Sequence, residues 1–176
     1  MDGILDFLRT RRSIRSFSEK PVSEKQLALL KEALLRAPTS RGLNPWQFIQ
    51  IDDPELLKGI AKAKTSGSAF LAKAPLAFAI CADTTISDVW LEDCSIAAIT
   101  LHYMAHSIGL GSCWVQIRLR QHDDHTGSED YLKKLLALPE HFRVVAVIGI
   151  GHPAEEKKGL PTSALPKGRF HHNVYK

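Results

Sequence analysis

The chain has 176 residues, of which 44% are hydrophobic and 24% charged, and its formal net charge is +4. A chain of this length buries roughly 70% of its unfolded surface, so we expect a single domain over residues 1–176. Internal repeats and low-complexity tracts are missing from the sequence, which argues against a scaffold. Neither a basic leader with a cleavage site nor an apolar stretch long enough to span a bilayer is present, so we expect a cytoplasmic protein.

The positive charge is concentrated near the two ends of the sequence. Because no RRM, zinc-finger or helix-turn-helix motif accompanies it, the pattern favours a small anionic ligand over nucleic acid. The three cysteines, Cys81, Cys94 and Cys113, lack CxxC spacing and lie in apolar segments. This pattern predicts small buried thiols rather than disulfides or metal ligands.

The first half of the chain contains recognisable helix starts. Asp2 can cap a short helix through Leu8, and Ser23 with Gln26 has the spacing of a capping box for the next helix. The segment from Phe48 to Ile51 is typical of a strand. Asp53-Pro54 then predicts another helix start, with proline in the first turn.

The second half alternates apolar strands with helices. Strands are predicted from Leu76 to Ala82, from Cys113 to Ile117 and from Val144 to Ile150. The segment from Trp90 to Ile108 is apolar around most of its circumference, which predicts a buried helix. Ser128 can cap a helix through Leu136. Helices outnumber scattered strands, so the fold class is α+β with a central sheet.

Two basic segments near the ends of the chain are the strongest functional signal. They are Arg11-Arg12-Ser13-Ile14-Arg15 and Lys167-Gly168-Arg169. Guanidinium groups bind phosphate in a bidentate way, and the Ser13 hydroxyl adds a donor without adding bulk, so the segments look like two halves of one phosphate clamp. The alternative for the first segment is a solvated basic turn after a short helix.

The loop from Ala37 to Trp46 reads APTSRGLNPW. Pro38 ends the preceding helix, and Pro45 is expected to restrict Asn44 to an extended conformation. Such a loop can present Thr39, Ser40 and Asn44 as uncharged donors and acceptors. Farther along, the segment GLGSCW from Gly109 to Trp114 follows the long apolar helix and predicts a helix stop whose glycines allow close approach to a flat ligand.

These four segments, in this order, resemble the FMN-dependent nitroreductase family over nearly the whole chain. The resemblance implies a mostly antiparallel central sheet flanked by helices, and FMN with NADH or NADPH as cofactors. It implies that FMN is bound by Arg11, Arg12, Ser13, Arg15, Lys167 and Arg169, that Pro38, Thr39, Ser40 and Asn44 reach the flavin of the partner subunit, and that Leu110 and Gly111 line its ring.

The resemblance also implies a homodimer. The terminal segment from Leu160 to Lys176 has no core of its own, and in the family this extension crosses to the other subunit. A dimer would further explain why so short a chain carries an apolar helix from Trp90 to Ile108.

The implied chemistry is ping-pong turnover, in which FMN takes a hydride at N5 from NAD(P)H and passes electrons to a nitroaromatic, a quinone or a similar small-molecule acceptor. Arg15 is the candidate catalytic residue, because a fixed cation near the pyrimidine edge would stabilise the charge of the reduced flavin. The alternative is that Arg15 only joins the phosphate clamp. At the level of the whole protein, the alternatives are an FMN-binding or flavin-sequestering protein without efficient turnover and a basic binding module.

Other polar and aromatic groups have simpler explanations. His102 and His106 lie four apart, but without the glutamate of HExxH or a third ligand they are interpreted as core or interface histidines. The segment from His122 to His125 and the pair His171-His172 are expected to face solvent, and we predict no metal site. Among the tryptophans, only Trp114 is a candidate to stack on a flavin or substrate.

Overall fold

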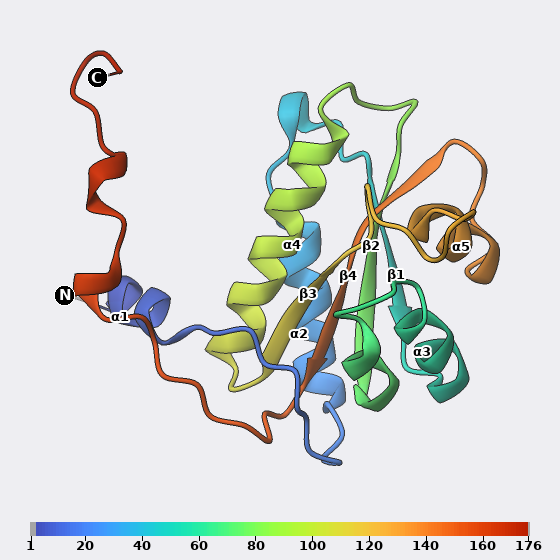
Figure 1. Ribbon diagram of the computed structural model, residues 1–176, viewed down its shortest axis with the longest axis horizontal. Helices are drawn as coiled ribbons and strands as arrows, with labels where there is room; N and C mark the ends of the chain where they lie inside the picture. Colours follow the sequence, from blue (N-terminus) through green and yellow to red (C-terminus); the bar gives the residue numbers. More distant parts are fainter. Residues whose placement is uncertain (1–2, 176) are drawn as a thin grey trace.

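The computed structural model describes residues 3–175, which contain a four-stranded antiparallel sheet (Figure 1). The strands are β1 (Trp46–Ile51), β2 (Leu76–Asp83), β3 (Gly111–Gln116) and β4 (Phe142–Gly151). Their order is β1-β2-β4-β3, with every neighbouring pair antiparallel, so β1 and β3 are the edge strands. Each predicted strand is present, and the predicted α+β class is confirmed.

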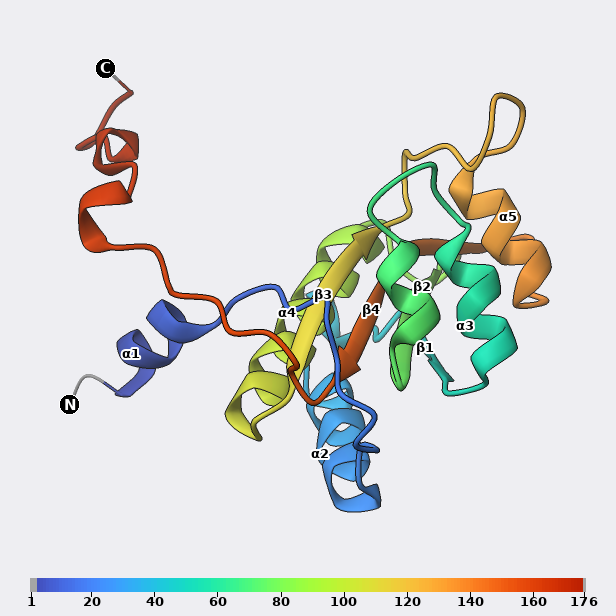
Figure 2. The same cartoon turned by 60° about the horizontal axis from the view of Figure 1, so that its bottom comes forward.

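Helices cover both faces of the sheet (Figure 1, Figure 2). The described residues form α1 (Gly3–Thr10), α2 (Glu24–Leu35), α3 (Pro54–Ala61), α4 (Trp90–Ser107) and α5 (Ser128–Leu135). Because side chains alternate along a strand, Phe78 and Ile80 of β2 join the apolar cluster under α2 and α4. Ala79 and Cys81 join the second cluster, under α3 and α5. Both faces of the central strands are therefore buried.

Two of the predicted helix starts are confirmed. Ser23 and Gln26 form a reciprocal capping box at α2, and the Asp53 carboxylate accepts hydrogen bonds from the first turn of α3. The prediction that Ser128 caps α5 is wrong. Gly127 is the capping residue, and the buried Ser128 hydroxyl is inside the helix with no hydrogen-bond partner in the described structure. The predicted cap at Asp2 lies outside the described residues.

Only one face of α4 is buried within the chain. Cys94, Ala98 and Leu101 pack against the sheet, whereas Ile96, Ile99 and Tyr103 are exposed. The prediction of a buried helix is therefore wrong for a single chain, because α4 packs with one side on the sheet and on α2 while the side that carries Ile96 and Ile99 is exposed (Figure 1).

The predicted helix stop after α4 is confirmed. Gly109 has a φ of +76°, its N–H donates to His106 O, and the Leu110 N–H donates to Ala105 O. These are the two hydrogen bonds of a Schellman motif, which needs a left-handed residue at this position.

The expected extended conformation of Asn44 is wrong, since its φ is +51°. The Asn44 N–H donates to Thr39 Oγ1 (3.2 Å), and that hydroxyl donates to Asn44 Oδ1 (2.9 Å). These two local bonds close the loop, and asparagine tolerates the left-handed region better than most residues. Their combined effect exceeds the preference that Pro45 imposes on Asn44.

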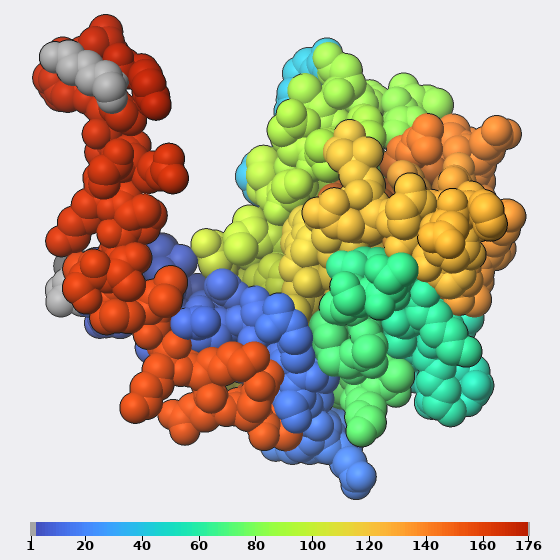
Figure 3. Space-filling view, viewed as in Figure 1, coloured from blue at the N-terminus to red at the C-terminus, as the bar shows by residue number. Residues whose placement is uncertain are grey.

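The carboxyl-terminal segment lies apart from the sheet. Residues 160–175 are all exposed, and the chain leaves the body past α1, none of whose residues is buried (Figure 3). Gly159 packs so closely against the Arg9 carbonyl that a Cβ atom would collide with it. Among residues 3–175, no helix combines the length and apolar character that crossing a membrane requires. All three cysteines are free and buried, as predicted.

Candidate anion-binding site

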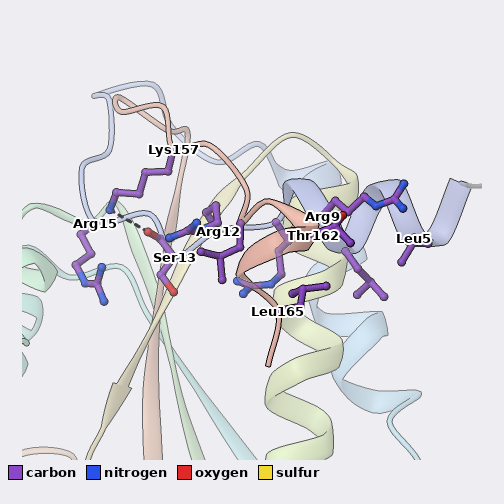
Figure 4. Close-up of a pocket in the computed structure, with 11 residues that line it drawn as sticks. Leu5, Arg9, Arg12, Ser13, Arg15, Lys157, Thr162 and Leu165 are labelled. Atoms are coloured by element: carbon purple, nitrogen blue, oxygen red, sulfur yellow. Dashed lines mark hydrogen bonds between the residues drawn. The ribbon is translucent and has the colours of Figure 1, made fainter. Parts of the chain in front are cut away.

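A pocket of about 770 Å³ lies between α1, the arginine-rich segment that follows it, and residues 157–165 (Figure 4). One part of its wall is apolar, formed by Leu5, Leu8, Leu160 and Leu165. The other part is cationic. Its charged members are Arg9, Arg11, Arg12, Arg15 and Lys157, and Ser13 adds a hydroxyl. Within the described residues, four of the six predicted clamp residues thus line one pocket.

The strand β3 holds this arginine-rich segment from one side. Ile14 N–H donates to Ser112 O (3.0 Å), and Ser13 and Ser112 form a parallel bridge. Ile14 is buried against Gly111, where a Cβ atom would approach Ile14 to 2.8 Å. Buried Ile14 thereby anchors the segment, while its neighbours Ser13 and Arg15 line the pocket.

The segment after β4 holds it from the other side. Ser18 N–H donates to His152 O and Ala154 N–H donates to Ser16 O, each at 2.9 Å. Arg12 Nη1 donates to Lys158 O at 2.7 Å. The basic segment is therefore a fixed part of the fold and not the freely solvated turn that was the alternative interpretation.

Lys157 is a pocket residue that sequence reasoning missed. Its Nζ donates to Ser13 O (3.1 Å) and lies 3.0 Å from Glu155 Oε1. It belongs to the run Glu155-Glu156-Lys157-Lys158, which has the composition of a solvated face. Lys157 directly precedes Lys158, whose carbonyl accepts from Arg12 Nη1, and this contact is visible only in the tertiary structure.

Lys167 and Arg169 lie elsewhere in the single chain. They form a short 3-10 helix, are exposed, and are not among the residues that line the pocket. Within one chain, the basic partner of Arg11 and Arg12 is Lys157 and not the predicted second half of the clamp.

The predicted loop residues lie at the opposite end of α4. Ser40 N–H donates to Oδ1 of buried Asp93 (2.8 Å) in the first turn of α4, and Pro38 and Thr39 precede it. Gly111 follows the last turn of the same helix. An α-helix of this length spans roughly 27 Å, so the loop containing Thr39 and Asn44 and the pocket containing Arg11 are far apart within one chain.

Leu110 and Gly111 are both buried and lie on the wall of a smaller cavity of about 250 Å³ beside Arg11 and Arg12. Beneath it, His102 Nδ1 and Ser112 Oγ share a hydrogen bond of 2.6 Å. Burial, with a smaller effect of Arg11, lowers the pKa of His102 to about 4. His102 is therefore a neutral core residue, as interpreted from the sequence.

Cys113 and Trp114 follow on β3. Burial raises the pKa of the Cys113 thiol, against the opposing effect of Arg15. The thiol is therefore not an activated nucleophile. Trp114 is half-buried, packs against the core and donates from its indole nitrogen to Gln116 Oε1 (2.9 Å).

Comparison of the sequence and the fold with known proteins identifies the class of this protein. The chain matches the model of the nitroreductase family over residues 8–75 and 62–152, which together span most of its length. The chain therefore belongs to the nitroreductase family.

Individual relatives and solved structures support this family membership. A solved FMN-dependent nitroreductase from Clostridium difficile R20291 superposes with a TM-score of 0.95, at 41% identity, over 97% of this chain and 99% of that one. A relative from Archaeoglobus fulgidus, provisionally named NADH dehydrogenase/NAD(P)H nitroreductase, is 34% identical over 161 residues, or 89% of each chain. The FMN reductase [NAD(P)H] of Bacillus subtilis is 28% identical over 94% of this chain and 73% of its own length. The family and these names support the predicted class, an NAD(P)H-dependent flavin oxidoreductase that uses FMN.

Proposed function

We propose that this chain is a single-domain FMN-dependent NAD(P)H oxidoreductase that reduces nitroaromatic compounds, quinones or similar electrophiles by ping-pong turnover. The observation that carries the proposal is the pocket whose lining includes Arg11, Arg12, Arg15 and Lys157 together with Ser13. Such a concentration of cations is costly unless an anion neutralises it.

The pocket fits FMN in chemistry and in size. Its volume of about 770 Å³ is within the range of cofactor sites, roughly 300–1,000 Å³. Guanidinium and ammonium groups suit a phosphate, while the leucines offer an apolar wall. Of the residues that we expect to hold the phosphate, Arg11 and Arg12 come first, and Ser13 adds a neutral donor.

FMN held by Arg11, Arg12 and Ser13 would supply the redox chemistry of the proposed reaction, the transfer of a hydride equivalent from NAD(P)H to the second substrate. The chain's own residues bind and orient it. Arg15 and Leu5 lie at opposite ends of the pocket (Figure 4). Arg15 is close enough to Cys113 to affect the pKa of its thiol. We propose for Arg15 a role distinct from that of the phosphate-binding arginines, namely a fixed positive charge near the ring.

We further propose that the active form is a homodimer. Ile96, Ile99 and Tyr103 follow an i, i+3, i+7 pattern and form one exposed apolar stripe on α4. Pairing two copies in opposite directions along this stripe would bring the loop of Pro38, Thr39, Ser40 and Asn44 of one chain toward the pocket of the other. The exposed tail from residue 160, with Lys167 and Arg169, is then free to cross to the partner.

Two observations on the purified chain test the proposal. Copurified FMN would distinguish a flavoprotein from a basic binding module, because the protein would be yellow. Anaerobic addition of NADH or NADPH should then bleach the flavin absorbance, and subsequent addition of a quinone or nitroaromatic should restore it. Bound FMN that neither donor bleaches would favour the alternative, a flavin-holding protein without turnover.

A further inference from the structure

We propose that Glu155 is a positioning residue of the anion site, whose carboxylate fixes the Arg15 backbone and the Lys157 ammonium group in the arrangement that receives the phosphate. The identity of the anion rests on the proposed function. The role of Glu155 itself rests on the contacts below, and it is unexpected because a carboxylate beside an anion site opposes anion binding by charge alone.

The Glu155 carboxylate bridges the two segments that form the cationic wall. Its Oε1 accepts hydrogen bonds from Arg15 N (2.6 Å) and Ser16 N (3.2 Å) and lies 3.0 Å from Lys157 Nζ. Lys157 Nζ in turn donates to Ser13 O at 3.1 Å. Both side chains are only 28–31% exposed, so these bonds are partly shielded from water.

These contacts continue where backbone pairing stops. The segment after β4 pairs with Ser16 and Ser18 through main-chain bonds, and Phe17 bridges Pro153. Beyond that point, the Glu155 and Lys157 side chains make the remaining bonds to the backbone at Ser13, Arg15 and Ser16. Without them, no described contact would tie the backbone of Arg15 to the segment after β4.

Glu155 is ionised under ordinary conditions. The hydrogen bond from the Arg15 N–H, followed in size by that from Lys157, lowers the pKa of its carboxyl group. A charged acceptor holds these donors more firmly than a neutral one. Two physical effects of Glu155 therefore oppose each other: repulsion of the phosphate, and organisation of the groups that bind it.

The Glu155→Gln variant separates these two effects, because they predict opposite changes in FMN affinity. The full chain is stripped of flavin and titrated with FMN and with riboflavin, which lacks the phosphate. If Glu155 positions the site, FMN affinity should fall about 10-fold, the amount expected for one charge-assisted bond, and riboflavin affinity should fall clearly less. Tighter or unchanged FMN binding would show that charge repulsion dominates and would overturn the proposal.

Matched variants exclude trivial explanations. Glu156→Gln removes the same charge from an exposed neighbour and should leave the preference for FMN unchanged. Glu155→Asp keeps the charge and should recover part of the affinity. An equal loss of FMN and riboflavin affinity in Glu155→Gln would indicate general loosening of the fold and would also contradict a role specific to phosphate.

Lys157→Met tests the same network if Glu155→Gln folds poorly. It should reproduce the selective loss of FMN affinity, whereas Lys158→Met, which changes an exposed side chain, should not. Unchanged FMN affinity in Lys157→Met would overturn the proposal. A wild-type chain with no preference for FMN over riboflavin would instead refute the phosphate site of the proposed function, so the two failures are distinguishable.

Discussion

Ile14 packs so tightly on Gly111 that a Cβ atom at position 111 would lie 2.8 Å from both Cβ and Cγ2 of Ile14. The sequence predicts that this glycine allows the close approach of a flat ligand. In the structure, the group that approaches Gly111 closely is Ile14 of the arginine-rich segment. Because Ile14 stands between Ser13 and Arg15, the packing of one apolar side chain sets the position of the polar groups on either side.

Gly111→Ala should therefore displace Ile14 and loosen the pocket. Overpacking of a core costs about 1–3 kcal/mol, which for a chain of this size lowers the melting temperature by roughly 2–12 °C. Thermal unfolding and FMN titration would measure both effects. Gly3→Ala is the control, since nothing lies within 4 Å of the added Cβ atom. Equal melting temperatures for the two variants would contradict the packing argument.

Arg11→Ala should weaken FMN binding by about 10- to 100-fold, the loss expected for one charge-assisted bond of 1.5–3 kcal/mol. Arg36→Ala, which removes an exposed arginine paired with Glu32, serves as the control. Arg169→Ala tests whether the tail joins the site in the assembled protein. If FMN affinity is unchanged in both Arg11→Ala and Arg169→Ala, the two basic segments do not form a phosphate clamp.

Ile99→Glu should dissociate the dimer, because it places a charge in the middle of the apolar stripe on α4. Sedimentation velocity would report the monomer, and FMN should be lost with the partner's loop. Leu35→Glu, at an exposed leucine of α2, should leave both properties intact. A monomeric Ile99→Glu variant that retains stoichiometric FMN would show that one chain builds the whole site.

The stability of the fold should depend on the protonation of His102. Its pKa is lowered from 6.5 to about 4, mainly by burial, so between these values the unfolded chain binds the proton more readily. Stability should accordingly be constant above about pH 6.5 and fall as the pH decreases toward 4, by up to about 3 kcal/mol. Urea unfolding across this range would measure the loss. His102→Asn should flatten the profile, whereas His125→Asn, at an exposed site, should not; a steep profile in His102→Asn would assign the effect to other groups.

Arg15→Met distinguishes the two roles proposed for Arg15. If its charge acts near the flavin ring, the midpoint potential and the anaerobic rate of bleaching should fall more than the FMN affinity. A role confined to phosphate binding predicts the reverse. Loss of affinity with a normal potential and rate in the flavin that remains bound would exclude the electronic role.

Helix caps, central strands and the family of this protein could be predicted from its sequence, because the signals for them are local. The capping groups at Ser23 and Asp53 act within three residues, and the apolar runs of β2 and β4 have the length and composition of central strands. The order of the arginine-rich turn, the polar loop and the Gly109 helix stop was sufficient to identify the family. Each of these signals depends on residues that are near one another in the chain.

The tertiary structure alone decided the details of the site. Glu155 and Lys157 meet Arg15 and Ser13 across about 140 residues of sequence, and no periodic pattern encodes such a contact. Likewise, the exposure of Ile99 depends on which face of α4 meets the sheet. Sequence determines which groups are available, but their distances, the solvent around them and their hydrogen-bond partners are set by how distant segments pack.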